Sequence, residues 1–96
     1  MNSLDNLLNT IGKIIKNDTY PKVYIRDGNI MLNYNETIII YSADGKIKNK
    51  NIPEAETKII ERLINENINL IKHHLFFHYQ KKMKEYQNLT NSLLLF

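Results

Sequence analysis

The three histidines of this chain fall within one seven-residue stretch, HHLFFHY at positions 73–79, among aromatic side chains. His74 and His78 are four residues apart, so on a helix their imidazoles would share one face, as in helices that bind zinc or nickel. Such a pair needs a third ligand, and no glutamate stands between the two as in the HExxH helix of metalloproteases. We therefore interpret these histidines as half-buried residues at a helix–sheet seam or an interface, and we predict no metal site.

Residue types that commonly carry catalysis occur here in positions with simpler explanations. Ser3, Ser42 and Ser92 stand in polar or terminal contexts, without the G-x-S-x-G turn of hydrolases. The three glycines are scattered, so the chain has no glycine-rich phosphate loop. Glu54 and Glu56 suit the positive end of a helix. We predict a non-enzymatic protein without catalytic residues and without a cofactor.

Lysines form two clusters that are candidates for phosphate contacts with a nucleic acid. The net charge is only +3, and Arg26 and Arg62 are the only arginines that could read bases. Tyrosines of the strand region would stack on unpaired bases if they were exposed. The alternative is that lysines on an edge strand prevent aggregation and that tyrosines simply suit sheets. The clustered residues are Lys46, Lys48 and Lys50 on an extended segment, and Lys81, Lys82 and Lys84 on a helix.

The length and composition of the chain favour one small intracellular domain. Its 96 residues, 43% of them apolar, suffice for one domain with a modest core. The absence of cysteine excludes disulfides and thiolate catalysis and suits a reducing cytoplasm. The first residues lack the features of a signal peptide, and the longest apolar run is far too short to span a membrane. We expect a single compact domain over residues 1–96, in the cytoplasm and without a membrane partner.

Apolar periodicity predicts a helix followed by a β-meander. In residues 1–17, leucines and isoleucines recur at spacings of three and four, the period of one helix face. Residues 20–50 read as strands, with turns at the two Asp-Gly pairs that end in Gly28 and Gly45. Connections this short favour antiparallel neighbours, so we expect three strands and a short fourth one around Ile47.

Both faces of the predicted sheet are apolar. Ile38 and Ile40 share one face of the third strand, while Ile39 and Tyr41 occupy the other. A sheet with one face in water would alternate more cleanly between apolar and polar residues. We therefore expect helices, or a partner chain, to cover part of the second face.

A helical region follows from residue 53 to residue 88, without glycine or an internal proline. One straight helix of this length would measure about 54 Å, which is too long for a compact domain of this size. Asparagines within residues 65–69 lower the helix propensity, so we predict a break or bend there. Residues 89–96 form an apolar tail that docks on the domain or contacts another chain. The predicted fold is α+β, with an N-terminal helix, a three- to four-stranded antiparallel β-meander and one or two C-terminal helices.

The helical turn at residues 75–79 is apolar on most sides. A small domain does not readily cover all sides of such a turn, which is therefore typical of a surface that contacts a partner. We predict a protein partner, with a homodimer as the expected oligomeric state. The predicted interface residues are aromatic or leucine side chains: Phe76, Phe77, Tyr79, Leu94, Phe96, Tyr24 and Tyr41.

Residues 20–80, about two thirds of the chain, resemble a small bacterial family of domains of unknown function. Members of that family carry a Pro-Pro-His-x-His-Val strand, a short sheet, a helix that opens with Leu-Pro, and a helix with a tryptophan. Here YPKVYIRDG stands in place of the histidine strand, and NIPEAETKIIERLINENINLIKHHLFFHY resembles the helical part, with Phe76 or Phe77 near the tryptophan position. Lys22 and Tyr24 replace the strand histidines, so the resemblance implies an α+β topology and no histidine site.

The composition also suggests a source. Asparagine and isoleucine are abundant, which is typical of AT-rich bacterial or phage genomes. Together with the small size, this favours a protein-binding module from a phage or mobile element that inhibits a larger bacterial defence complex, of the anti-CRISPR type. The alternative prediction is a small nucleic-acid-binding regulator that uses the two lysine clusters.

Overall fold

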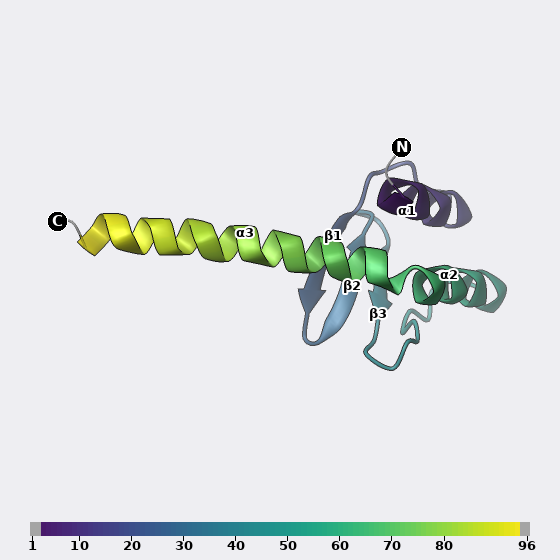
Figure 1. Cartoon of the computed structure of the whole chain (residues 1–96). Coiled ribbons are helices and arrows are strands. Elements are labelled where there is room, and N and C mark those ends of the chain that lie inside the picture. Colours follow the sequence, from purple (N-terminus) through teal and green to yellow (C-terminus); the bar gives the residue numbers. More distant parts are fainter. Residues whose placement is uncertain (1–2, 95–96) are drawn as a thin grey trace.

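The structure is a computed structural model that describes residues 3–94, and the side chains of residues 3–89. Within these residues, one helix precedes a three-stranded antiparallel sheet of order β1-β2-β3, and two helices follow it (Figure 1). The predicted α+β class is confirmed. The elements are α1 (Ser3–Ile14), β1 (Lys22–Arg26), β2 (Asn29–Asn33), β3 (Ile38–Tyr41), α2 (Glu54–Glu66) and α3 (Ile68–Leu94).

The register of the sheet sorts its side chains into two faces. Val23 of β1 lies opposite Leu32 of β2, which in turn lies opposite Ile39 of β3. These side chains share the inner face of the sheet with Ile30 and Tyr41, because residues paired across antiparallel strands point to the same side. All five belong to the hydrophobic core or pack against it, so the inner face is the one that the helices cover.

The outer face of the sheet carries a second apolar row. Tyr24, Met31 and Ile40 lie side by side on the three strands. Met31 is buried and its two neighbours are half-buried, yet none of the three belongs to the core cluster of the described residues. Both faces are therefore apolar, as predicted, and the helices of residues 3–94 pack on the inner one.

The core lies between the inner face of the sheet and all three helices. α1 packs against both α2 and α3, and the first turns of α3 pack on β1. Full burial of one large apolar side chain contributes roughly 1.5–3 kcal/mol, so this cluster is the main source of stability. Its buried helical members are Leu4, Leu7, Leu8 and Ile11 of α1, Ile60 and Ile64 of α2, and Ile71 of α3.

The segment after β3 does not form a full fourth strand. Ile47 makes a single antiparallel bridge with Tyr41. Beyond it, the Asn49 side chain replaces a strand backbone: its Oδ1 accepts from the Ile40 N–H at 2.8 Å, and its Nδ2 donates to the Ile38 carbonyl at 2.7 Å. The edge of β3 is therefore satisfied by the Asn49 amide together with the Lys48 N–H, which donates to the Ile40 carbonyl at 2.9 Å, and the sheet needs no further strand.

Two side chains of α2 hold the turn that follows β3. The Ile47 N–H donates to Glu61 Oε2 at 3.1 Å. One helical turn later, Asn65 accepts a hydrogen bond from the Tyr41 hydroxyl and donates from Nδ2 to the Gly45 carbonyl at 3.2 Å. The turn is thereby tied to the helix that covers the inner face.

α1 ends in a tight reversal, which explains the glycine inside its apolar pattern. Lys16 has a left-handed backbone (φ 57°), and the Asn17 N–H donates to the Gly12 carbonyl at 2.8 Å, as in a Schellman motif. A Cβ atom on Gly12 would lie only 2.8 Å from the Asn17 carbonyl oxygen and 3.4 Å from the Tyr34 ring. The last residues of the predicted helix 1–17 thus form this reversal, and the close approach requires a glycine.

The predicted break in the C-terminal helical region lies at Asn67, between α2 and α3. The Asn67 N–H donates to the Ile64 carbonyl at 3.1 Å, and Asn67 Nδ2 donates to the Leu63 carbonyl at 2.8 Å. An asparagine side chain that bonds to nearby backbone in this way competes with a continuing helix. The prediction of a break within residues 65–69 is confirmed.

α3 is the longest element, and much of it projects from the core (Figure 1). Its 27 residues span about 40 Å, and the longest dimension of the molecule is 57 Å. Ile71 is fully buried and Leu75 packs against the core, but every side chain from residue 76 to residue 89 is exposed. The helix continues through residues 89–94, which the sequence predicted as a tail.

Candidate protein-binding surface

Four large side chains form an apolar row along the projecting part of α3, and we call this row the α3 stripe. Its residues are spaced by three, four and three positions, which is the spacing of the apolar seam in a coiled coil. Their exposed fractions lie between 41% and 67%. Such a row on one face of a helix is typical of a surface that packs against another protein. The residues are Phe76, Tyr79, Met83 and Tyr86.

Two residues of the α3 stripe, Tyr79 and Tyr86, continue the face by which α3 packs on its own core. Ile68, Ile71 and Leu75 all belong to the core or pack against it. Tyr79 and Tyr86 follow Leu75 after four and eleven residues, which places them on the same side of the helix. One helix face is thus covered by the domain in its first turns and exposed in the rest.

A groove of about 360 Å³ opens where the α3 stripe meets the sheet. Ile25 of β1 is exposed there, although it points to the inner face of the sheet. The groove and the stripe share residues and form one continuous, largely apolar surface. The lining residues are Ile25, Ile30, Lys72, Leu75, Phe76 and Tyr79.

The opposite side of α3 carries Phe77 and the histidines. Phe77 is 69% exposed, and the His74 and His78 rings stack with 6.1 Å between their centroids. All three histidines are exposed, because His73 and His74 project from a side of α3 other than the face of Ile71 and Leu75, and His78 lies beyond the core. The predicted histidine packing at a helix–sheet seam is therefore wrong within this chain, and an interface remains the prediction. Among the described residues, no group of three or more potential ligands is placed to hold a metal ion.

The two lysine clusters lie on separate parts of the molecule. The first alternates with the partly buried Ile47 and Asn49 on the segment after β3, which is the predicted pattern. The second lies on the projecting part of α3, away from that segment (Figure 1). They therefore do not combine into one basic surface. All six side chains are exposed: Lys46, Lys48, Lys50, Lys81, Lys82 and Lys84.

Tyr41, one of the predicted interface residues, lies in the core with 7% of its surface exposed. Its hydroxyl donates to Asn65, and burial is the main cause that raises the pKa of Tyr41. Tyr34 is fully buried, its hydroxyl donates to the Leu8 carbonyl at 2.6 Å, and burial raises its pKa as well. Because the helices cover these two rings, neither offers a contact surface to a partner or to a base.

Two other tyrosines of the strand region lie nearer the surface. Tyr24 is half-buried on the outer face of the sheet, where its hydroxyl accepts from Asn33 Nδ2 at 3.4 Å. Tyr20 is exposed, and its hydroxyl donates to Asp5 Oδ1 at 2.6 Å, which raises the pKa of Tyr20. Tyr24 therefore stays a candidate contact residue, beside the row that contains Met31.

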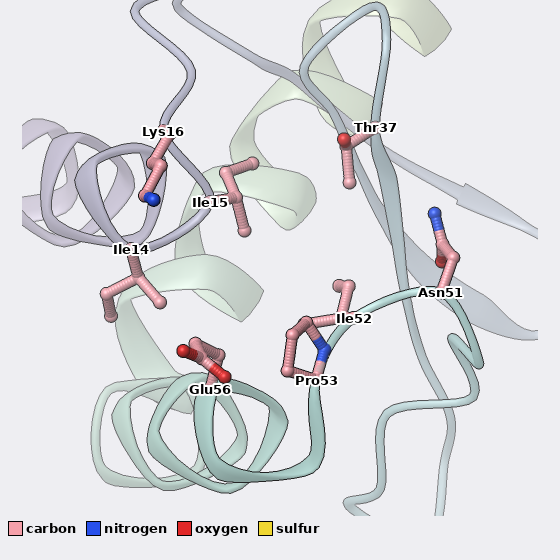
Figure 2. A pocket seen from close by; sticks show the side chains of 8 residues that line it. All are labelled: Ile14, Ile15, Lys16, Thr37, Asn51, Ile52, Pro53 and Glu56. Carbon is pink, nitrogen blue, oxygen red and sulfur yellow. The ribbon is translucent and has the colours of Figure 1, made fainter.

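A separate hollow of about 260 Å³ opens between the end of α1 and the start of α2 (Figure 2). Four of its eight lining residues are isoleucine or proline, and its two charged residues, Lys16 and Glu56, have opposite signs. It brings together no nucleophile with a base and no set of anion-binding donors, so we assign it no chemistry. The lining residues are Ile14, Ile15, Lys16, Thr37, Asn51, Ile52, Pro53 and Glu56.

The structure places the predicted interface residues in different environments. Phe76 and Tyr79 belong to the α3 stripe, whereas Phe77 lies on the other side of the same helix. Leu94 is helical with a side chain outside the described part, and Phe96 lies outside the described residues altogether. Sequence reasoning missed the rest of the stripe, which is Met83 and Tyr86. The signal was available, because their spacing of seven and ten residues from Phe76 is that of one helix face.

Comparison with known proteins finds no matching family model, no matching curated protein and no matching solved structure. The resemblance of residues 20–80 to a family of domains of unknown function therefore stays a prediction. Among the described helices, none combines the length and the apolar character needed to cross a membrane. The geometry of α3 is thus the main guide to function.

Proposed function

We propose that the protein is a small non-enzymatic protein-binding module whose contact surface is the α3 stripe. The supporting observation is that four large apolar side chains are exposed along one face of a helix that projects from the core. Exposed apolar area is unfavourable in water, and amphipathic helices commonly bind proteins through rows of residues with this spacing. A partner that covers the stripe would remove that area from water.

The projecting part of α3 also has little to keep it helical by itself. Residues 80–94 comprise fifteen positions, and isolated helices of that length are marginal in water. Several of these residues are asparagine, tyrosine, threonine or serine, which are modest helix formers. Packing of the stripe against another surface would supply the missing stabilisation.

The proposed biological setting is inhibition of a larger bacterial defence complex by a phage or mobile-element protein, of the anti-CRISPR type, in the cytoplasm. This part of the proposal rests on the small size of the chain, its lack of cysteine and its abundance of asparagine and isoleucine.

Affinity capture from a lysate of the source cells tests the proposal with two neighbouring phenylalanines as a matched pair. Phe76 and Phe77 are 61% and 69% exposed, so replacing either with alanine should leave the fold intact. Wild type and Phe77→Ala should retain the same partner, while Phe76→Ala should lose it. Equal retention by both variants would contradict the role of the stripe, and circular dichroism confirms that both remain folded.

Nucleic-acid binding by the outer face of the sheet is a second candidate function. The observation that favours it is the position of the first lysine cluster: the Lys48 N–H donates to the Ile40 carbonyl at 2.9 Å, which sets the cluster at the β3 end of the row formed by Ile40, Met31 and Tyr24. Exposed cations at one end of a row and an aromatic ring at the other suit a single strand that crosses the sheet. Labelled oligonucleotides at low salt should bind wild type and bind weakly to a variant with Lys46, Lys48 and Lys50 changed to alanine. If wild type binds none of them, this candidate function is excluded.

A further inference from the structure

We propose that the α3 stripe packs against the α3 stripe of a second copy of this chain, with the two helices antiparallel. The inference rests on the proposed function, because it names the partner of the same surface. The seam spacing of the stripe is itself typical of helix pairing, since the three–four alternation lets each large side chain insert between residues of a facing helix.

The residues beside the stripe are compatible with a second copy. Gln80 and Gln87 flank it on one side, while Lys82 and Leu89 flank it on the other. Charges at these flanking positions commonly decide which helices pair. Lys82 is the only charged residue among them, so these positions carry no cluster of like charges that would repel an identical helix. The other charges of this part of α3 lie on the far side of the helix.

The antiparallel orientation follows from the position of the core. Tyr79 and Tyr86 of the stripe lie on the same helix face as Leu75, which packs on the domain. A parallel pair would therefore bring the second core against the first at the same end of the helices. An antiparallel pair places the two cores at opposite ends, so each projecting half of α3 is free to lie along the other.

The same orientation also gives the apolar groove an occupant. The stripe has two alternating kinds of seam position, one held by Phe76 and Met83 and the other by Tyr79 and Tyr86. In an antiparallel pair, each kind faces the other kind on the second helix. Met83 of one copy then lies level with Tyr86 of the other, and Tyr86 of the first lies level with Met83 of the second. Counting outward in this register brings position 93 of the second helix level with Phe76. The end of the second helix then lies over the groove beside Ile25 and Leu75. A parallel pair would leave that groove open.

The exposed apolar area is at the lower limit for a specific dimer. Phe76, Tyr79 and Tyr86 are 61%, 63% and 67% exposed, and an aromatic side chain offers about 150–250 Å². The three side chains therefore contribute roughly 300–450 Å² per copy, to which Met83, Leu89 and the groove add. Two copies together reach about 1,000 Å², where specific interfaces begin. We expect a reversible dimer that dissociates in the micromolar range.

Sedimentation over a range from about 1 to about 200 µM tests the pairing, because a micromolar dimer dissociates within it. Wild type should change from monomer to dimer as the concentration rises. Met83→Asp places a charge in the seam and should weaken association about 30-fold or more. Lys84→Asp introduces the same residue one position further, on the far side of the helix, and should keep the dimer. A wild type that stays monomeric, or a dimer that survives Met83→Asp, overturns the pairing.

These outcomes are separable from a failure of the proposed function. If wild type is monomeric but Phe76→Ala still loses a partner that Phe77→Ala retains, the self-pairing is wrong and the protein-binding function stands. If a dimer forms but Phe76→Ala leaves capture unchanged and Met83→Asp leaves association unchanged, the α3 stripe is not the contact surface.

Oxidative cross-linking tests the orientation, because the chain has no cysteine of its own. A mixture of the single variants Met83→Cys and Tyr86→Cys, distinguished by a size tag on one of them, should form a mixed disulfide dimer. Phe76→Cys alone should form none, since position 76 lies far from its own copy in an antiparallel pair. Efficient cross-linking of Phe76→Cys with itself would show a parallel pair and overturn the proposed orientation.

Discussion

At the scale of single residues, Tyr34 shows how one side chain joins distant parts of the chain. Its ring is fully buried, and its hydroxyl donates to the Leu8 carbonyl of α1 at 2.6 Å. Its own carbonyl accepts from Asn17 Nδ2 at 2.9 Å, and its N–H donates to the Thr37 carbonyl at 2.9 Å. The residue therefore connects α1, the loop after α1 and the turn between β2 and β3.

Tyr34→Phe should lower the free energy of unfolding by about 1 kcal/mol, because a buried hydrogen bond is lost while the ring remains. Urea unfolding at neutral pH measures the change. At a concentration where the protein is monomeric, Tyr79→Phe is the matched control, since the Tyr79 side chain is then exposed. Identical midpoints for wild type and Tyr34→Phe would contradict the contribution of this hydrogen bond.

The raised pKa of Tyr34 also predicts a loss of stability at alkaline pH. Burial favours the neutral phenol in the folded state, whereas the unfolded chain titrates near the ordinary value of 10.0. The contribution of Tyr34 is therefore fully present below pH 10 and is lost as the pH rises above 10.

The measurement is urea unfolding at about pH 8 and about pH 11, on either side of the ordinary tyrosine pKa. The free energy of unfolding should fall between the two values, and it should fall less for Tyr34→Phe. Tyr20 and Tyr41 remain in both proteins, so the difference isolates Tyr34. An equal decrease in the free energy of unfolding of the two proteins would show that burial does not keep Tyr34 neutral in the folded state at alkaline pH.

At the scale of elements, α1 depends on a glycine that its own helix propensity disfavours. In a free helix, Gly12→Ala would stabilise by about 1 kcal/mol. Here the added Cβ would lie 2.8 Å from the Asn17 carbonyl oxygen, in a backbone reversal that has little room to move. Gly12 therefore lowers the helix propensity of α1, but it permits the tight backbone reversal that leads towards β1.

Gly12→Ala should lower the free energy of unfolding by about 1–3 kcal/mol, the usual cost of overpacking a closed site. Asn9→Ala, at an exposed position of the same helix, should be neutral or slightly stabilising. Thermal unfolding followed by circular dichroism compares both with wild type. A Gly12→Ala protein more stable than wild type would mean that the close approach does not exist in solution.

At the scale of the whole molecule, the chain consists of a packed core and a projecting half-helix. The last residue that packs against the core is Leu75, and all described side chains beyond it are exposed. The projecting half thus contributes surface rather than core. The core is stabilised by contacts within the chain, whereas the described side chains of the projecting half make no core contacts.

Removal of residues 81–96 should therefore leave the core folded. At a concentration where wild type is monomeric, the free energy of unfolding should change by less than about 1 kcal/mol, because no core contact is lost. Association at high concentration should disappear with the stripe. If the shortened chain fails to fold, the end of α3 must contribute to the core.

Much of the fold was predictable from the sequence, because the signals are local. Apolar spacings of three and four indicate the helices, alternation indicates the strands, and the Asp-Gly pairs mark the turns. The break at Asn67 follows from a side chain that competes with its own backbone. The stripe from Phe76 to Tyr86 is also a local spacing, although sequence reasoning followed it only as far as Tyr79.

Only the tertiary structure decided which of these apolar residues became surface. Tyr41 and Phe76 look alike as aromatic interface candidates in the sequence, but Tyr41 lies in the core with a hydrogen bond to Asn65 of α2, whereas Phe76 stays 61% exposed. The missing fourth strand likewise depends on Asn49, which reaches back across eleven residues to Ile38. The burial of a side chain and the hydrogen bonding of a sheet edge both depend on contacts between residues that are distant in sequence. Local patterns therefore determine the elements, and the packing of those elements determines which apolar side chains stay exposed.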